Sequence, residues 1–320
     1  MVLPDYTELS NFSTRKDGKK LTIDLSVCLI INKLSDPVDT INSIYHFTAQ
    51  TNYKTEVLII NIDKEGYKYD RLLASFPALR ILLPKEKISL NQVLSLGIRE
   101  SLAPFVMILT DDFKIKSVDM EILQTYFSQN STGILIPQVT DEYDGIIPNI
   151  VKASIKLGFL DTVSIDKQGT ALSSFYPKYP CFIINKEMFL SRGIELADYD
   201  DPLYGLLELG LRVWRESYMI LQVSNFKVRL LSSPKQDIHF DSNNPDYIRF
   251  NYTSFTGQDT TAGRGRKIFG IVLKWMVTFR FGKIGRLFGA INSIRDNAKK
   301  EAQYPVDDRT LFRTVNRDLD

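Results

Sequence analysis

Two adjacent aspartates, Asp111 and Asp112, come directly after the apolar run FVMILT. Such a run predicts a buried strand, here over 105–112, that ends abruptly in the two carboxylates. Because α/β folds bind their ligands at the carboxyl ends of strands, this pair is the first candidate for binding chemistry. The alternative is a solvated turn that only ends the strand.

A second group of charged side chains accompanies a predicted helix that begins at Pro202. Asp201, directly before this proline, has the position of an N-cap with proline at the first helical residue. Leucines and glycines then recur at helical spacing, which is typical of a buried helix face. Glu208 and Arg212 lie one turn apart on the other face, where they can form an ion pair.

The elements that position these residues alternate along the chain. From Leu21 onward, short β-branched runs alternate with helical patterns, which predicts an α/β fold with a mainly parallel sheet and helices on both faces. Ser89 and Gln92 have capping-box spacing and predict a helix start near residue 90. The stretch 133–179 is less regular and shows few clear helices. The predicted strands are 21–31, 55–61, 79–84, 105–112, 133–139, 180–185 and 225–231, and the clearest helices are 38–50 and 202–216.

The order and spacing of these pieces resemble the family 2 glycosyltransferases, which have the Rossmann-like GT-A fold, over roughly residues 24–250. The family's first strand is matched by SVCLIIN, and its second strand, which ends in polar residues, is matched by EVLIINID. The helix that carries the family's NxGI pattern is matched loosely by SLNQVLSLGI, and the strand that ends in the short acidic metal motif is matched by ILTDD.

The resemblance implies a hexosyl- or deoxyhexosyltransferase of polysaccharide biosynthesis. It would move a sugar from a nucleotide-diphosphate donor to a glycan or lipid-linked acceptor, with inversion. Mg²⁺ or Mn²⁺ held by carboxylates would neutralise the departing diphosphate. By position in the family's motifs, the metal residues are Asp112 and His239, and the donor-binding residues are Asn32, Asn61, Asp63, Asp111 and Arg212.

The sequence departs from the family at the catalytic base. Inverting members carry a Glu-Asp pair six or seven residues before the helix arginine, and here Gly205 and Leu206 occupy those positions. The remaining candidates for the base are Asp200, Asp201 and Glu208, although Asp201 also suits an N-cap and Glu208 an ion pair. The departure keeps open a second function, that of a catalytically silent relative that binds glycans or scaffolds their assembly.

The C-terminal part of the chain is strongly basic. Residues 264–300 contain ten basic residues and one acid, a net charge of +9, so the rest of the chain carries −7 within a total of +2. Aromatic and aliphatic residues at helical spacing lie between the cations, which predicts an amphipathic segment that contacts an anionic membrane surface. The alternative is that its apolar faces pack on the catalytic domain. No nucleic-acid motif is present, so nucleic acid is not an expected partner.

The sequence predicts three segments: a polar N-terminal tail over 1–20, a GT-A domain over 21–250 and a basic helical extension over 251–320. The last residues of the extension, from 304 onward, are expected to be loosely attached. The longest apolar stretch, 268–279, is too short to span a bilayer. Two cysteines and two histidines cannot form a structural zinc cluster, and no secretory signal is visible. A cytoplasmic protein, peripheral on the inner face of the cell membrane, is expected.

Overall fold

The computed structural model describes most of the chain up to residue 232 and a few segments after it. The described residues are 3–11, 15–16, 19–20, 22–31, 38–50, 53–62, 69–76, 78–128, 131–156, 159–194, 196, 199, 201–232, 244, 246–247, 250–251, 308–317 and 319. The candidate residues Asn32, Asp63, Asp200 and His239, and the basic segment 264–300, lie outside them.

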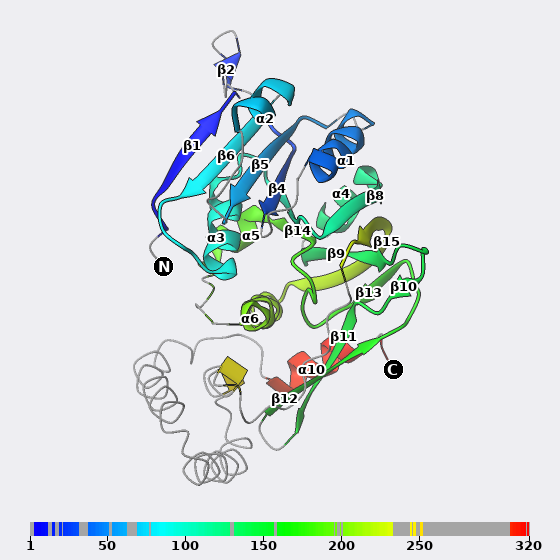
Figure 1. Ribbon diagram of the computed structural model, residues 1–320. Coiled ribbons are helices and arrows are strands. Elements are labelled where there is room, and N and C mark those ends of the chain that lie inside the picture. The colour runs from blue at the N-terminus through cyan, green and yellow to red at the C-terminus, as the bar shows by residue number, and fades with distance from the viewer. Residues whose placement is uncertain are drawn as a thin grey trace.

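The centre of the molecule is one mixed sheet, in which four neighbouring strands run parallel (Figure 1). Apolar runs that are buried on both faces form these strands, as expected for a parallel sheet covered by helices. The four parallel strands, in spatial order, are β6 (Leu79–Pro84), β5 (Thr55–Asn61), β4 (Leu25–Ile31) and β7 (Phe105–Thr110).

The second half of the sheet changes direction. β14 (Phe182–Asn185) lies antiparallel between β7 and β9 (Thr132–Thr140), and β9 then pairs in parallel with β15 (Met219–Leu230). Three further strands complete this half, all antiparallel: β13 (Ala171–Ser173) and β8 (Phe113–Val118) on β15, and β10 (Ile146–Ile147) on β9.

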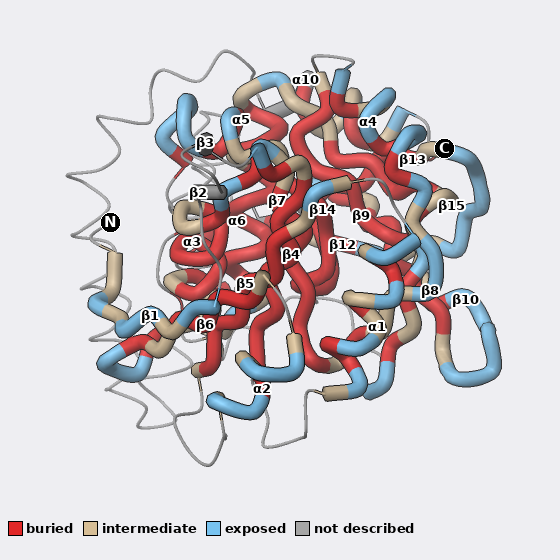
Figure 2. The backbone as a smooth tube through the Cα atoms, turned by 90° about the horizontal axis from the view of Figure 1, so that it is seen from above, coloured by how far each residue is buried: buried red, intermediate tan, exposed pale blue. Residues whose placement is uncertain are grey.

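Helices cover both faces of the sheet, as the sequence predicts. On β4, the alternation of side chains sends Cys28 and Ile30 into one apolar cluster and Val27 and Leu29 into the other. The first cluster includes residues of α3 (Leu90–Glu100), α5 (Lys186–Ser191) and α6 (Pro202–Arg215). The second includes residues of α1 (Val38–Ala49), α2 (Tyr69–Ser75) and α4 (Met120–Ser128). Figure 2 shows the strands between them as a continuous buried layer.

Segments near both ends of the chain pack against this domain. β1 (Tyr6–Ser10) pairs antiparallel with β6, so the tail predicted over 1–20 contains an edge strand of the sheet. The prediction of a loosely attached C-terminus is wrong for α10 (Asp308–Asn316), which buries Leu311 and Val315. The apolar stripe of α10 is only two turns long, too short to stand out as a periodic pattern in a polar sequence.

The helix α10 packs against a hairpin outside the main sheet. Its strands are β11 (Ile150–Lys156) and β12 (Phe159–Ile165). The Asn316 side chain bonds both backbone groups of Ala153, accepting from its N–H at 3.3 Å and donating to its carbonyl at 2.8 Å. Among the described helices, none combines the length and hydrophobicity needed to cross a membrane.

A buried ionic network closes the amino edge of the parallel strands. Glu56, at the start of β5, is fully buried and accepts hydrogen bonds from the Ser26 hydroxyl, the Leu102 N–H and the Arg80 guanidinium. Arg80 also pairs with Glu8 of β1, with Nε and Oε1 2.8 Å apart. The network therefore ties the edge strand β1 to the interior of the sheet.

Candidate functional site

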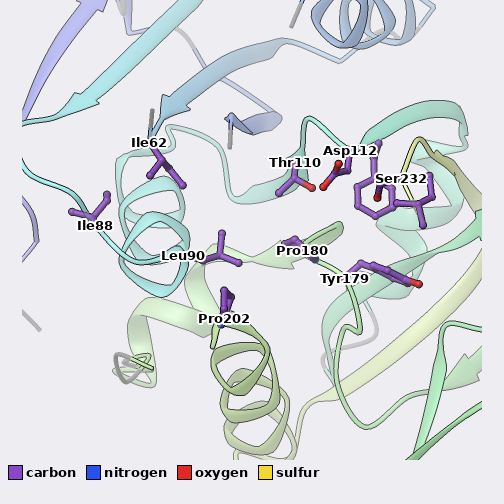
Figure 3. Close-up of a pocket in the computed structure, with 11 residues that line it drawn as sticks. Ile62, Ile88, Leu90, Thr110, Asp112, Tyr179, Pro180, Pro202 and Ser232 are labelled. Atoms are coloured by element: carbon purple, nitrogen blue, oxygen red, sulfur yellow. The ribbon is translucent and has the colours of Figure 1, made fainter. Parts of the chain in front are cut away.

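A pocket of about 310 Å³ opens at the carboxyl edge of the sheet, between β7, α3 and α6 (Figure 3). Its polar lining consists of Thr110, Asp112 and Ser232, and Tyr179 adds an aromatic ring. The apolar lining consists of Ile62, Ile88, Leu90, Phe113, Pro180, Pro202 and Leu230. The volume is at the lower end of the range for small-molecule sites.

The two aspartates form the turn that follows β7. The Asp111 N–H donates to the Ile30 carbonyl of β4 at 3.1 Å, and the Leu231 N–H donates to the Asp112 carbonyl at 2.7 Å. The turn is therefore fixed to the ends of β4 and β15 on its two sides. Asp112 lines the pocket and is partly exposed, whereas Asp111 is 7% exposed and does not line it. The structure thus places only the second of the two aspartates in the pocket lining.

The start of α3 forms one wall of the pocket, and the predicted capping box positions it. The Ser89 hydroxyl accepts from the Gln92 N–H at 3.3 Å, and the Gln92 side chain accepts from the Ser89 N–H at 2.9 Å. These bonds satisfy two donors at the helix start, so the capping-box prediction is confirmed. Ile88 and Leu90, on either side of the cap, both line the pocket (Figure 3).

The start of α6 lies beside the start of α3 in the lining (Figure 3). The Asp201 carboxylate accepts from the Leu203 N–H at 3.0 Å, and the Asp201 N–H donates to the Asp246 carboxylate at 2.9 Å. The predicted N-cap with proline at the first helical position is thus confirmed. Pro202 lines the pocket, which places Asp201 at its border.

The loop before β14 supplies a wall that the sequence analysis did not identify. Tyr179 is buried and meets Phe113 edge to face, with ring centroids 5.7 Å apart. Lys178 is also buried and donates from Nζ to the Ser164 hydroxyl of β12 at 2.8 Å. The aromatic and proline residues of SFYPKYP could have indicated a buried loop. An irregular segment has no helical or strand periodicity, however, so the sequence does not show which of its side chains point inward.

Other predicted site residues have partners away from the pocket lining. The buried Asn61 amide donates to the Tyr69 hydroxyl at 2.8 Å. Glu208 and Arg212 form the expected ion pair on α6, with Oε1 and Nη2 2.6 Å apart, and neither lines the pocket. Their roles in binding or catalysis remain predictions from the family motifs.

Gly205 and Leu206, which occupy the positions of the family's acid pair, are both buried. A Cβ atom at Gly205 would overlap the side-chain amide of Asn91. On the next turn, a Cβ at Gly210 would lie 2.5 Å from the Phe175 carbonyl oxygen. The two glycines let α6 approach its neighbours closely, and this packing leaves no room for an acid at position 205.

We expect Gly205→Ala to lower the free energy of unfolding by about 1–3 kcal/mol, because overpacking outweighs the helix propensity gained by alanine. Denaturant unfolding measures the loss. The double variant Gly205→Ala with Asn91→Ala should lose less than the sum of the single variants, since it removes the overlapping atoms. Strictly additive losses would contradict the contact.

The pocket residues fit a divalent cation that is shared with a phosphate ligand. No group of three or more His, Cys, Asp and Glu side chains is arranged to hold a metal within the described part of the chain. Mg²⁺ and similar ions are often held by only one or two carboxylates together with substrate phosphates. Asp112 supplies one such carboxylate, directed into the pocket and next to Thr110 (Figure 3).

Comparison with solved structures identifies the fold. The chain superposes on the crystal structure of GalNAc-T7 with UDP, GalNAc and Mn²⁺ with a TM-score of 0.56 and 15% identity, over 75% of this chain and 50% of that one. The chain thus spans about half of the length of that protein. It superposes on S. aureus TarS 1–349 in complex with UDP-GlcNAc with a TM-score of 0.54 and 9% identity, over 85% of this chain and 80% of that one. No protein-family model matches the sequence, and no curated protein matches it in sequence. The chain has a GT-A-like glycosyltransferase fold.

Proposed function

We propose that this chain, with its GT-A-like fold, is a family 2 glycosyltransferase that moves a sugar from a nucleotide-diphosphate donor to a glycan or lipid-linked acceptor, with inversion. The observation that carries the proposal is the turn at Asp111 and Asp112, which places one carboxylate in a pocket at the carboxyl edge of the sheet. The two superposed structures contain UDP or a UDP-sugar, which supports a nucleotide-sugar donor.

Asp112 would hold Mg²⁺ or Mn²⁺ together with the donor phosphates. When bound, the ion supplies positive charge that neutralises the departing diphosphate. The chain's own part is to fix the Asp112 carboxylate through the backbone bonds of its turn and to exclude water with apolar walls. The Mn²⁺ in the GalNAc-T7 structure supports this cofactor class.

Binding and hydrolysis of the donor test the proposal. Calorimetry of the full chain with UDP, GDP and dTDP should show binding of at least one nucleotide that strengthens when Mn²⁺ or Mg²⁺ is added. The corresponding nucleotide sugar should then be hydrolysed slowly in the absence of an acceptor. If none of the nucleotides binds with either metal, the proposal is wrong.

Among the described residues, Asp201 is the candidate best placed to deprotonate the acceptor, because its neighbour Pro202 lines the pocket. Asp201→Asn should lower turnover by about 10²-fold or more, the usual size of a general-base effect. Asparagine caps a helix as well as aspartate does, so the thermal midpoint should change little. Glu208→Gln tests the other described candidate, which pairs with Arg212 outside the pocket lining, and should leave turnover unchanged if Asp201 is the base.

A catalytically silent relative that binds glycans is the second candidate function. The observation in its favour is that buried helix packing at Gly205 and Leu206 replaces the family's acid pair. If Asp200→Asn, Asp201→Asn and Glu208→Gln all keep the rate of the unaltered chain, or if donor binding occurs without any turnover, this second function is favoured.

We further propose that the basic segment 264–300 brings the protein to the inner face of the cell membrane. The full chain should sediment with anionic vesicles at low salt and be released as salt rises, because each basic residue near such a surface contributes about 1 kcal/mol and salt screens it. Replacing the ten basic residues with glutamine is the informative variant, because truncation would also remove α10, which packs on β11. Failure to sediment even at low salt would favour packing of this segment on the protein itself.

A further inference from the structure

One side of the pocket carries its polar groups, and the other side is apolar throughout. Thr110, Asp112 and Ser232 lie on the first side, at the ends of β7 and β15, together with the apolar side chains of Phe113 and Leu230. Figure 3 shows Ile62, Ile88, Leu90 and Pro202 on the other side, around the starts of α3 and α6. A ligand that spans the pocket therefore meets two different chemical surfaces.

The apolar side follows from how the two helices begin. Polar residues are present there, but Ser89 and Gln92 bond each other's backbone across the first turn of α3. The Asp201 carboxylate likewise caps α6 through the Leu203 N–H. These capping bonds hold the polar side chains against the helix ends. The apolar residues next to them in sequence, Ile88, Leu90 and Pro202, line the pocket instead. Among the described residues, no charged side chain lines this side.

A sugar hydroxyl placed against such a wall loses its hydrogen bonds to water and gains none from the protein, which is unfavourable. A methyl group in the same place loses no hydrogen bond and removes apolar surface from water. Discrimination by an apolar wall is moderate, about 10-fold to 200-fold for one such group, because the wall does not strongly reject an added hydroxyl.

We propose that this pocket selects a donor whose sugar carries a methyl-bearing substituent in place of a hydroxyl, as a 6-deoxyhexose or an N-acetylhexosamine does. The substituent packs against Leu90 and its apolar neighbours, while the diphosphate and the remaining hydroxyls face Thr110, Asp112 and Ser232. The inference rests on the proposed function, because it takes the nucleotide sugar as the ligand of the pocket.

Matched donor pairs on one nucleotide test the selection, since the contribution of the nucleotide cancels within each pair. Calorimetry of the full chain with Mn²⁺ compares UDP-glucose with UDP-N-acetylglucosamine, UDP-galactose with UDP-6-deoxygalactose, and GDP-mannose with GDP-6-deoxymannose. We expect the methyl-bearing member of at least one pair to bind about 10-fold tighter or more. Whether this is an acetamido or a deoxy sugar distinguishes the two sources of the methyl group.

Substitutions on the apolar side of the pocket test whether these residues cause the preference for a methyl-bearing donor. Leu90→Asn places hydrogen-bonding groups on the partly exposed first residue of α3 and should bring the affinity ratio within the selected pair toward one. Ile62→Thr, at the end of β5, should act in the same direction with a smaller loss of volume. Leu190→Asn is the control: this leucine is 41% exposed on α5 and does not line the pocket, so the ratio should be unchanged.

The outcomes separate this inference from the proposed function. If UDP or GDP binds but each pair has equal affinities, or prefers the hydroxyl, the inference is overturned and the function stands. A ratio that survives both Leu90→Asn and Ile62→Thr also overturns it. If neither nucleotide nor any of their sugars binds, the proposed function is overturned and the inference with it.

Discussion

Asp112→Asn is expected to remove the metal-dependent part of nucleotide binding and to lower turnover by about 10²–10³-fold, the usual effect of losing one electrostatic stabiliser of a transition state. Asparagine is nearly isosteric with aspartate but carries no charge, so a divalent cation loses its carboxylate in the pocket. The backbone carbonyl that accepts from Leu231 is retained, so the turn should keep its conformation.

Calorimetry with and without Mn²⁺ gives the binding effect, and the thermal midpoint checks the fold. Asp24→Asn is the matched control: Asp24 lies at the amino edge and accepts from the Lys54 N–H at 2.9 Å, a bond that asparagine can also accept. Equal metal-dependent affinity in Asp112→Asn and the unaltered chain would remove Asp112 from the metal site.

Arg80→Met is expected to lower the free energy of unfolding by about 3–5 kcal/mol, because it leaves the buried Glu56 carboxylate without its cation. Glu56 is 0% and Arg80 6% exposed, so water cannot replace the lost pairing. The Arg80 side chain also donates to the Glu100 carbonyl at 2.9 Å, a bond that methionine cannot make. Denaturant unfolding with an unchanged slope measures the effect.

Glu8→Gln is the comparison for Arg80→Met. The Glu8 side chain is 35% exposed, so the loss of its charge should cost no more than about 1 kcal/mol. Both substitutions lie toward the amino edge of the sheet, opposite the pocket, and should leave nucleotide affinity unchanged. A loss in Arg80→Met no larger than in Glu8→Gln would show that the network contributes little to stability.

Local signals in the sequence were enough to determine the four parallel strands, the starts of α3 and α6 and the acidic turn, but they did not reveal β1, β8, β11 or β12. The predictions for β5 and β6 agree with the structure residue for residue, since both are short runs centred on consecutive apolar residues. The capping box at Ser89 and the N-cap at Asp201 depend on neighbouring residues only, and both are confirmed. The acidic pair was placed correctly after β7, although the strand itself ends at Thr110.

Only the tertiary structure decided which of these residues meet. Nothing local in PCFIIN shows that β14 lies antiparallel between β7 and β9, because the order of strands depends on contacts between segments far apart in the chain. The placing of Tyr179 against Phe113, and the packing of Gly205 against Asn91, depend on the same distant contacts. The sequence by itself determined the parallel strands and the acidic turn, whereas the shape of the pocket and the apolar side of its lining exist only after distant segments pack together.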